Sequence, residues 1–206
     1  MSDFLAPAWA GLRAPVFARL DFVNAEVSGL VVLVLASGRG ERFAASGGGG
    51  PKLQALLGGI PVLQRTLDAV QASGLAWHLE SAPHPGMGDS IAAAVRATRA
   101  AAGWLVLPGD LPLVLPETLR AVAASLATRT VVVPQYRGQR GHPVGFSADC
   151  GAALAALSGR QGAAAIVRGQ AAAGRVFALE VGDAGIVTDI DTTADLARAE
   201  ELIRRS

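Results

Sequence analysis

Residues 30–43 read Leu-Val-Val-Leu-Val-Leu-Ala-Ser-Gly-Arg-Gly-Glu-Arg-Phe, and this stretch decides the fold. Its first six residues are all valine or leucine, which is typical of a strand buried on both faces of a sheet. The small residues from Ala36 to Gly40 then predict a tight turn at the carboxyl end of that strand. Because open α/β sheets bind their ligands at this edge, the turn is also the first candidate binding site.

Strands and helices alternate along the rest of the chain. We expect further strands at 77–80, 104–107, 131–133, 176–181 and 186–190, and helices that begin at Pro61, Ile91 and Pro116, near residues 148 and 163, and after Asp191. Gly74 ends the helix that Pro61 opens, and Thr192 and Asp195 have the spacing of a capping box. Residues 44–51 and 137–142 are predicted loops. The alternation predicts an α/β sandwich around a mostly parallel sheet.

Composition restricts the classes of function. With 51% hydrophobic residues, 17% charged residues and a net charge of +1, the chain gives no reason to expect nucleic-acid binding, which requires a basic face. No apolar run reaches the ~18 residues that a membrane-spanning helix needs. The single cysteine, Cys150, excludes an internal disulfide and fits a reducing cytoplasm. Residues 1–28 lack a regular period and a secretory signal, so we expect an N-terminal arm, or a start codon assigned too early, before one domain at 29–206.

Lys52 is the one lysine beside 17 arginines. A lysine in so arginine-rich a chain indicates a task for a compact ammonium group rather than a planar guanidinium. Together with Arg42 it can neutralise a triphosphate, while backbone N–H groups of the 36–40 turn can form an anion-binding nest. Taken alone, the short Gly-x-Gly pattern favours the alternative, a tight strand-to-helix turn with two solvated cations.

Three aspartates follow predicted strands at the same edge of the sheet. Asp110 ends the run Leu-Pro-Gly-Asp (107–110), where a hard oxygen ligand suits a Mg²⁺ ion that bridges phosphates. Capping of the next turn is an equally good interpretation of Asp110. Asp189 and Asp191 end the last predicted strand, and we expect only one of them to point at a ligand. Asp191 or Thr192 can also serve as the cap of the final helix.

Two glycine-containing segments are weaker candidates. The segment Gly-Met-Gly-Asp-Ser (86–90) precedes a helix, and its amide groups can contact a base or ribose. A plain helix start explains this segment at least as well. The loop Gly-Gln-Arg-Gly-His-Pro (138–143) can present Arg140 and His142 to an anionic second substrate, although a loop histidine is more often simply solvated.

Taken in order, these segments resemble the molybdenum-cofactor nucleotidyltransferases, and most closely the molybdopterin cytidylyltransferase branch. The matching pieces are Leu-Ala-Ser-Gly-Arg-Gly-Glu-Arg-Phe (35–43) with Lys52, Gly-Gly-x-Pro-Val-Leu (58–63), Gly-Met-Gly-Asp-Ser-Ile (86–91), Leu-Pro-Gly-Asp-Leu-Pro (107–112), Gly-His-Pro-Val-Gly-Phe (141–146) and Asp-Ile-Asp-Thr-x-x-Asp-Leu (189–196). Each piece is short, but six in the same order are specific for the superfamily.

The resemblance implies a three-layer, Rossmann-like nucleotidyltransferase fold and Mg²⁺-dependent transfer, in the cytoplasm, from CTP to the phosphate of molybdopterin, with release of pyrophosphate. It implies that Arg42 and Lys52 hold the triphosphate, that Asp110 binds the metal with Asp191 as a second ligand, and that His142 faces the pterin. The remaining residues that it places at the bound nucleotide are Leu35, Ala36, Ser37, Gly38, Gly40, Gly88, Ser90 and Gly109. A client molybdoenzyme is a further candidate partner, whereas nucleic acid and membrane are not expected partners.

Three departures from the family pattern carry expectations of their own. The glycine-rich insert lengthens the interval from Arg42 to Lys52, so the loop must fold back for Lys52 to reach the site. The interval from Gly74 to Gly86 is too short for the usual strand–helix pair, so the sheet should lack one such pair. Ser37 stands where the guanylyltransferase relatives favour glycine, which favours CTP over GTP.

Two other functions fit the same residues. One is nucleotidyl transfer to another phosphorylated acceptor, such as a sugar or isoprenoid phosphate, or transfer that uses GTP. The other is a non-catalytic chaperone that binds the molybdenum cofactor and retains a vestigial nucleotide site. The short 74–86 interval favours the chaperone, while Lys52 and Asp110 favour an enzyme.

Overall fold

The valine–leucine run forms β1 (Leu30–Leu35), an interior strand of a seven-stranded sheet. The computed structural model describes residues 29–205, so the predicted arm at 1–28 lies outside the described residues. β1 pairs in parallel with β4 (Ala76–Glu80) on one side and with β5 (Gly103–Pro108) on the other. β8 (Val144–Ser147) runs antiparallel between β5 and β6 (Val131–Tyr136), and β9 (Val176–Glu180) pairs in parallel with β6. The expected α/β architecture with a mostly parallel sheet is confirmed.

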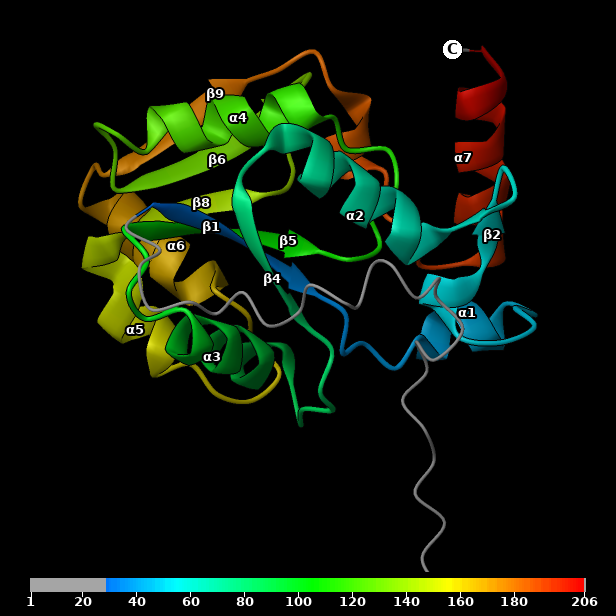
Figure 1. Cartoon of the computed structure of the whole chain (residues 1–206), viewed down its shortest axis with the longest axis horizontal. Helices are drawn as coiled ribbons and strands as arrows, with labels where there is room; N and C mark the ends of the chain where they lie inside the picture. The colour runs from blue at the N-terminus through cyan, green and yellow to red at the C-terminus, as the bar shows by residue number, and fades with distance from the viewer. Residues whose placement is uncertain (1–28, 206) are drawn as a thin grey trace, which may run out of the picture.

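Helices cover both faces of this sheet, as Figure 1 shows. α2 (Val62–Ser73) and α4 (Pro116–Ser125) pack on one face, and α3 (Met87–Ala97), α5 (Gly151–Ala155) and α6 (Ala164–Ala172) lie on the other. Side chains of β1 alternate between the two layers, because successive residues of a strand point to opposite faces. Val32 and Val34 join the core under α2 and α4, whereas Val31, Leu33 and Leu35 join the core under α3 and α5.

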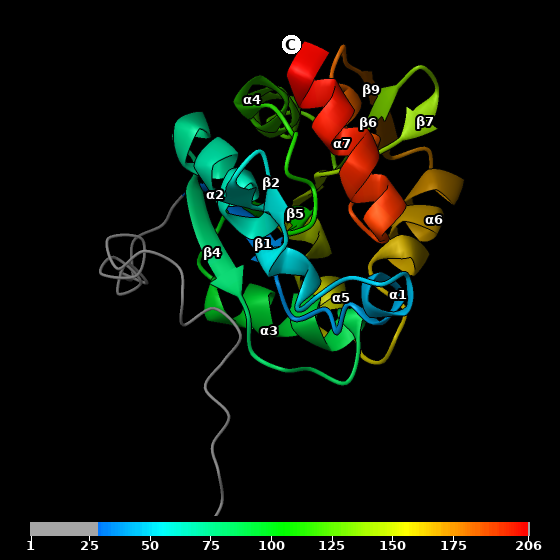
Figure 2. The ribbon, with the colours of Figure 1, turned by 90° about the vertical axis from the view of Figure 1, so that its right-hand side faces the viewer.

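A third, smaller core lies beside the carboxyl edge of the sheet. It joins α1 (Glu41–Ala45), the hairpin of β2 (Leu56–Leu57) and β3 (Ile60–Pro61), and α7 (Thr193–Arg205), which lie side by side in Figure 2. Its buried members are Phe43, Leu57, Val62, Ile190 and Ala199. This core brings the first turn of the domain and its last helix together next to the strand ends.

The two predicted ends of α2 are confirmed. The helix starts directly after Pro61, and it stops at Gly74, whose φ of 73° is left-handed and therefore suits glycine. β4 is the edge strand beside β1, and residues 81–86 lead directly from it into α3. The described part of the chain accordingly has no further strand or helix on that side, as the short 74–86 interval predicts.

Two local predictions are wrong, and one strand was not predicted. The segment 186–190 is not a strand: it forms the 3₁₀ turn η4 (Ala184–Val187) and an irregular stretch, because the Asp183 carboxylate caps the turn by accepting the Gly185 N–H at 2.8 Å. The loop at 137–142 contains β7 (Gln139–Arg140), which pairs with the end of β6 in a hairpin. The antiparallel strand β8 has only four residues and gave no clear pattern in the sequence.

The capping box at the start of α7 is present. The Asp195 carboxylate accepts the Thr192 N–H at 2.6 Å, and the Thr192 hydroxyl accepts the Asp195 N–H at 3.2 Å. Burial alone would raise the pKa of Asp195, but the hydrogen bonds from Thr192 outweigh it and hold that pKa below its ordinary 3.8. The ionised carboxylate therefore stabilises the folded chain.

We expect Asp195→Asn to lower the free energy of unfolding by about 1 kcal/mol at pH 7. A carboxyl group whose folded pKa is depressed contributes stability above its unfolded pKa and loses it as the pH falls through the folded pKa. The difference between wild type and variant should therefore shrink below about pH 4. Urea unfolding at pH 7 and pH 3 measures it, with exposed Asp149→Asn as the control. A difference that stays constant with pH would contradict this role of the charge.

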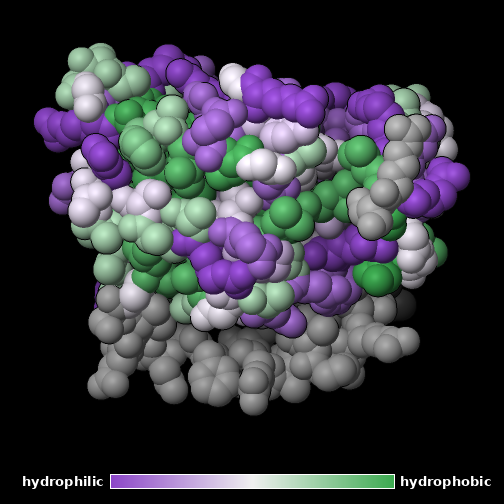
Figure 3. All heavy atoms as spheres, turned by 90° about the horizontal axis from the view of Figure 1, so that it is seen from above, coloured by the Kyte–Doolittle hydropathy of each residue, from purple (hydrophilic) through white to green (hydrophobic). Residues whose placement is uncertain are grey.

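The described surface carries no large apolar face on the side seen in Figure 3. Hydrophobic residues there occur in small groups that hydrophilic side chains separate. Within residues 29–205 no helix has the length and apolar character that crossing a membrane requires.

Candidate active site

A cavity of about 750 Å³ opens at the carboxyl ends of β1 and β5. The 36–40 turn and α1 form one wall, the residues around the start of α3 form a second, and the loops near β7, α6 and η4 form a third. The cavity is lined by Leu35, residues 37–43, Lys52, Leu53, residues 84–87, Pro108, Asp110, Leu111, residues 139–142, Arg160, Ile186, Val187, Asp189 and Asp191.

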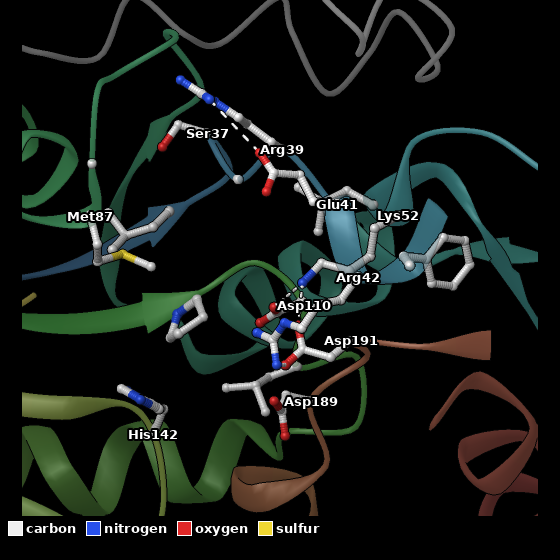
Figure 4. A pocket seen from close by; sticks show the side chains of 18 of the residues that line it. Ser37, Arg39, Glu41, Arg42, Lys52, Met87, Asp110, His142, Asp189 and Asp191 are labelled. Carbon is white, nitrogen blue, oxygen red and sulfur yellow. Dashed lines mark hydrogen bonds and ion pairs between the residues drawn. The ribbon is translucent and has the colours of Figure 1, made fainter. Parts of the chain in front are cut away.

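Lys52 lies between two carboxylates at the centre of this cavity, as Figure 4 shows. Its Nζ donates to Asp110 Oδ2 at 2.7 Å and to Asp191 Oδ1 at 2.9 Å. Arg42 reaches the other oxygen of Asp191 at 2.7 Å from the exposed side. The Lys52 side chain is only 12% exposed, so its ammonium group is held by these carboxylates rather than by solvent. Four residues from three distant segments thus form one charged cluster.

The glycine-rich insert folds back, which lets Lys52 reach the cluster. Its Ser46 hydroxyl accepts the Thr193 N–H at 3.0 Å, and the Thr193 hydroxyl donates to the Ser46 carbonyl at 2.9 Å. Gly48 lies against the buried ring of Phe43, where a Cβ would come within 2.2 Å of ring carbons. The insert is therefore attached both to α1 and to the start of α7.

The charges of the cluster shift one another's pKa values. Burial would lower the pKa of Lys52, but the charge and hydrogen bond of Asp110 outweigh it and raise that pKa above its usual 10.5. Burial would likewise raise the pKa of Asp191, but the hydrogen bond and charge of Lys52 lower it. Burial and the neighbouring Asp191 raise the pKa of Asp189. Lys52 and Asp191 are therefore charged at neutral pH.

Asp189 and Asp191 do not lie on a strand, so the reason for expecting only one of them to point at a ligand is absent. Both side chains line the cavity and lie near each other in Figure 4. The segment that carries them is irregular rather than a strand. Asp189 was not expected to share the site with Asp191, yet its carboxyl group lies within it.

The residues present fit a divalent cation that is shared with a substrate. No three histidine, cysteine or carboxylate side chains within residues 29–205 are arranged to hold a metal by themselves. Mg²⁺, however, usually takes one or two carboxylates and completes its shell with phosphate oxygens and water. Asp110 and Asp191 supply two such carboxylates, and the buried Oδ1 of Asp110 accepts no hydrogen bond in the described structure. A hard cation is the partner that this oxygen suits.

Five of the predicted nucleotide- and pterin-binding residues line the cavity: Leu35, Ser37, Gly38, Gly40 and His142. Gly40 has a φ of 63°, and a Cβ there would lie 3.2 Å from the Cβ of Lys52. A side chain at this position would be strained by the left-handed backbone conformation and would crowd Lys52.

The other four predicted residues, Ala36, Gly88, Ser90 and Gly109, do not line the cavity. Ser90 is fully buried, and its hydroxyl is hydrogen bonded to that of Ser37. Gly109 donates its N–H to the Leu35 carbonyl at 2.9 Å, and its own carbonyl accepts from Thr66 at 3.1 Å. Ser90 and Gly109 therefore support cavity-lining residues from behind. The predicted 86–90 loop is already the first turn of α3, which begins at Met87 rather than Ile91.

His142 and Arg140 reach the cavity from the β7 hairpin and the loop after it. Burial lowers the pKa of His142, and its Nδ1 is buried without a hydrogen-bond partner among the described residues. His84 and Arg160 also line the cavity, and neither was singled out from the sequence. Arg160 lies in a Gly-Arg-Gln-Gly turn, whose sequence signals only a turn.

Comparison with known proteins gives a family. The MobA-like NTP transferase domain matches residues 68–176, which is more than half of the chain. Among curated proteins, the bifunctional protein GlmU of Coxiella burnetii (strain Dugway 5J108-111) is 31% identical over 117 residues. That match covers 46% of this chain and 25% of GlmU, so the chain spans about a quarter of the curated relatives it matches.

Solved structures share the fold over most of the chain. Rv0371c from Mycobacterium tuberculosis H37Rv is 27% identical with a TM-score of 0.65, covering 84% of this chain and 98% of that one; it has also been solved in complex with manganese. A nucleotidyl transferase from Methanothermobacter is 23% identical with a TM-score of 0.71. The match covers 85% of this chain and 98% of that one. Molybdopterin-guanine dinucleotide biosynthesis protein A from Archaeoglobus fulgidus is 19% identical with a TM-score of 0.56. The match covers 85% of this chain and 100% of that one.

Proposed function

The chain belongs to the MobA-like NTP transferase family, and from this we propose that it transfers a cytidylyl group from CTP to the phosphate of molybdopterin in a Mg²⁺-dependent reaction. Residues 29–206 would form the domain that carries out this reaction. The molybdopterin-related name of one solved structure with this fold supports the choice of acceptor.

One observation carries the proposal: Lys52 and Asp110 meet inside a cavity at the carboxyl edge of the sheet, with their charged atoms 2.7 Å apart. Arg42 and Asp191 complete the cluster. Two cations beside two carboxylates suit a triphosphate and a divalent metal ion, because the cations neutralise phosphate oxygens and the carboxylates attract the metal.

The proposed reaction is an in-line substitution at phosphorus. An oxygen of the acceptor phosphate forms a bond to the α-phosphorus of CTP, and the bond from that phosphorus to the bridging oxygen breaks, so pyrophosphate leaves. A phosphate monoester is already largely ionised at pH 7, so the step requires no general base. Lys52 and Arg42 would neutralise the departing pyrophosphate, and a bound Mg²⁺ ion would supply further charge neutralisation. Catalysis by this chain would consist of positioning and electrostatics.

Ser37 supports the choice of CTP. Its side chain lines the cavity, and its hydroxyl is tied to the buried Ser90. A side chain held in this way takes space that a glycine would leave free to a larger purine base. The smaller pyrimidine base of CTP suits the narrower site.

A pyrophosphate-release assay with molybdopterin and Mg²⁺ tests the proposal. We expect release with CTP, at a kcat/KM about tenfold or more above that with GTP. Faster release with GTP would overturn the choice of base while leaving the reaction class intact. Release only with a sugar or isoprenoid phosphate would overturn the acceptor. Tight binding of molybdopterin without release from any nucleotide would favour a cofactor-binding chaperone.

A further inference from the structure

The start of α3 holds a loop from a distant part of the chain. The Gly88 N–H donates to the Gly159 carbonyl at 2.9 Å, and the Asp89 carboxylate accepts the Gly159 N–H at 2.9 Å. These two hydrogen bonds seat residues 158–161, the loop between α5 and α6, against the first turn of α3.

The glycines of this motif are required by that contact. A Cβ at Gly86 would lie 2.1 Å from the Gly159 carbonyl oxygen and 2.7 Å from the Arg160 backbone nitrogen. A Cβ at Gly88 would lie 2.7 Å from the Ser158 carbonyl oxygen. Distances this short do not occur in folded proteins, so any side chain at either position would displace the loop. Both glycines therefore pack against the 158–161 loop, and Gly86 also lines the cavity.

Seating this loop places Arg160 at the cavity. Arg160 lines it, as does Arg140 from β7, and both residues are exposed. Within residues 29–205 neither guanidinium forms a hydrogen bond or an ion pair, in contrast to Lys52 and Arg42, which are both paired with Asp191. The charges of these two cavity-lining arginines are therefore not neutralised by a hydrogen bond or ion pair within the described part of the chain.

The position of Arg160 relative to Lys52 indicates which group of the substrates Arg160 binds. In an in-line substitution the attacking and leaving oxygens lie on opposite sides of phosphorus. Lys52 and Arg42 form the cationic group at the carboxylate cluster, which suits the departing pyrophosphate. Figure 4 shows Met87 on the opposite side of the cavity from Lys52, and the backbone of Arg160 packs against the neighbouring Gly86. Arg160 therefore lies on the side of the cavity away from Lys52, from which the attacking group would approach in the proposed reaction.

We propose that Arg160, assisted by Arg140, binds the phosphate group of the acceptor, and that the Gly-Met-Gly-Asp motif at 86–89 positions Arg160 for this task. The proposal rests on the proposed function for the identity of the reaction, and it adds the residues that would recognise the acceptor's phosphate group. A guanidinium suits this group because its N–H donors can pair with two phosphate oxygens at once.

Steady-state kinetics of Arg160→Ala test the proposal, with Arg168→Ala, an exposed arginine on α6 outside the cavity, as the matched control. We expect the KM for molybdopterin to rise about 10- to 100-fold, the loss typical of a hydrogen bond to a charged group. The KM for CTP should stay within about twofold, and Arg160→Lys should recover part of the loss. An equal rise in the KM for CTP, or no change in either KM, would overturn the proposal.

A binding measurement separates this proposal from the proposed function. Calorimetry compares molybdopterin with the same pterin lacking its phosphate, and this requires no turnover. We expect wild type and Arg168→Ala to prefer the phosphorylated form and Arg160→Ala to lose about tenfold or more of that preference. A preference that survives in Arg160→Ala, or that wild type lacks, would refute the role of Arg160. Absence of pyrophosphate release would instead refute the reaction.

Gly86→Ala tests the positioning role without removing a charge. We expect this variant to raise the KM for molybdopterin in the same direction as Arg160→Ala, because the added methyl group displaces the 158–161 loop. Gly169→Ala is the control, since nothing lies within 4 Å of its Cβ position. An unchanged KM in folded Gly86→Ala would contradict the positioning role, and if that variant fails to fold, Arg160→Ala still decides the binding role.

Discussion

Replacing Asp110 by asparagine should lower kcat for pyrophosphate release by about 10³-fold, the effect expected when a group that stabilises transition-state charge is lost. Asp110 lies two residues after the end of β5, and its carbonyl accepts the Ile190 N–H at 3.0 Å, which holds its backbone in place. One of its oxygens accepts from Lys52 at 2.7 Å, and the other is buried without a partner. Asparagine retains the shape but removes the charge that attracts both Lys52 and a metal ion.

The control for this variant is Asp68→Asn. Asp68 is an exposed residue of α2 that accepts a hydrogen bond from Gln64, and it lies outside the cavity. Because Lys52 keeps its bond to Asp191, Asp110→Asn should remain folded, which thermal unfolding checks. If folded Asp110→Asn keeps a kcat within tenfold of wild type, at any Mg²⁺ concentration, Asp110 has no essential role in the proposed reaction.

The second large effect is expected at Lys52, where even arginine should reduce kcat by about 10²-fold. The ammonium group donates to two carboxylates at 2.7 and 2.9 Å from a side chain that is 12% exposed. A planar guanidinium is larger and directs its donors in a fixed fork, so it cannot take the same place between Asp110 and Asp191. A displacement of about 1 Å at a catalytic group is enough for a loss of this size.

Two further variants define the cause of that loss. Lys52→Met removes the charge with little change in length and should cost about 10³-fold. Arg42→Lys keeps a charge at a side chain that is 75% exposed, so it should cost less than about tenfold. Full activity in Lys52→Arg would show that the charge alone matters and that the compact shape of lysine does not.

Much of the fold could be predicted from local sequence. The valine–leucine run of β1, Pro61 and Gly74 at the ends of α2, and the Thr192–Asp195 capping box all act through backbone dihedral angles or hydrogen bonds within a few residues. The segment at 186–190 could not be predicted in this way. Its apolar residues resemble a strand, but the contact of Gly185 with the Leu113 carbonyl and the cap from Asp183 hold the chain in a 3₁₀ turn instead.

The candidate site likewise has features that local sequence predicts and features that only tertiary contacts decide. Strand ends place the 36–40 turn and Asp110 at one edge of the sheet, so their proximity follows from the alternation of strands and helices. The meeting of Lys52 with Asp110 was a geometric expectation, and its atomic form depends on the fold of the glycine-rich insert against Phe43 and Thr193. Arg160 carried no signal of its own, because the contact that places it joins Gly86 and Gly88 to a loop far away in the chain.

The amino-acid order by itself determined the α/β architecture, the family pattern and the residue types needed for phosphate chemistry, since these depend on side-chain periodicity and short-range backbone preferences. The tertiary structure alone decided that Asp189 and Asp191 share the cavity, that Ser90 and Gly109 lie behind it, and that the 86–89 motif seats the loop of Arg160. The physical reason is packing: whether two distant backbones can approach within 3 Å depends on the absence of a Cβ at the point of contact, and no local pattern records which segments will meet there.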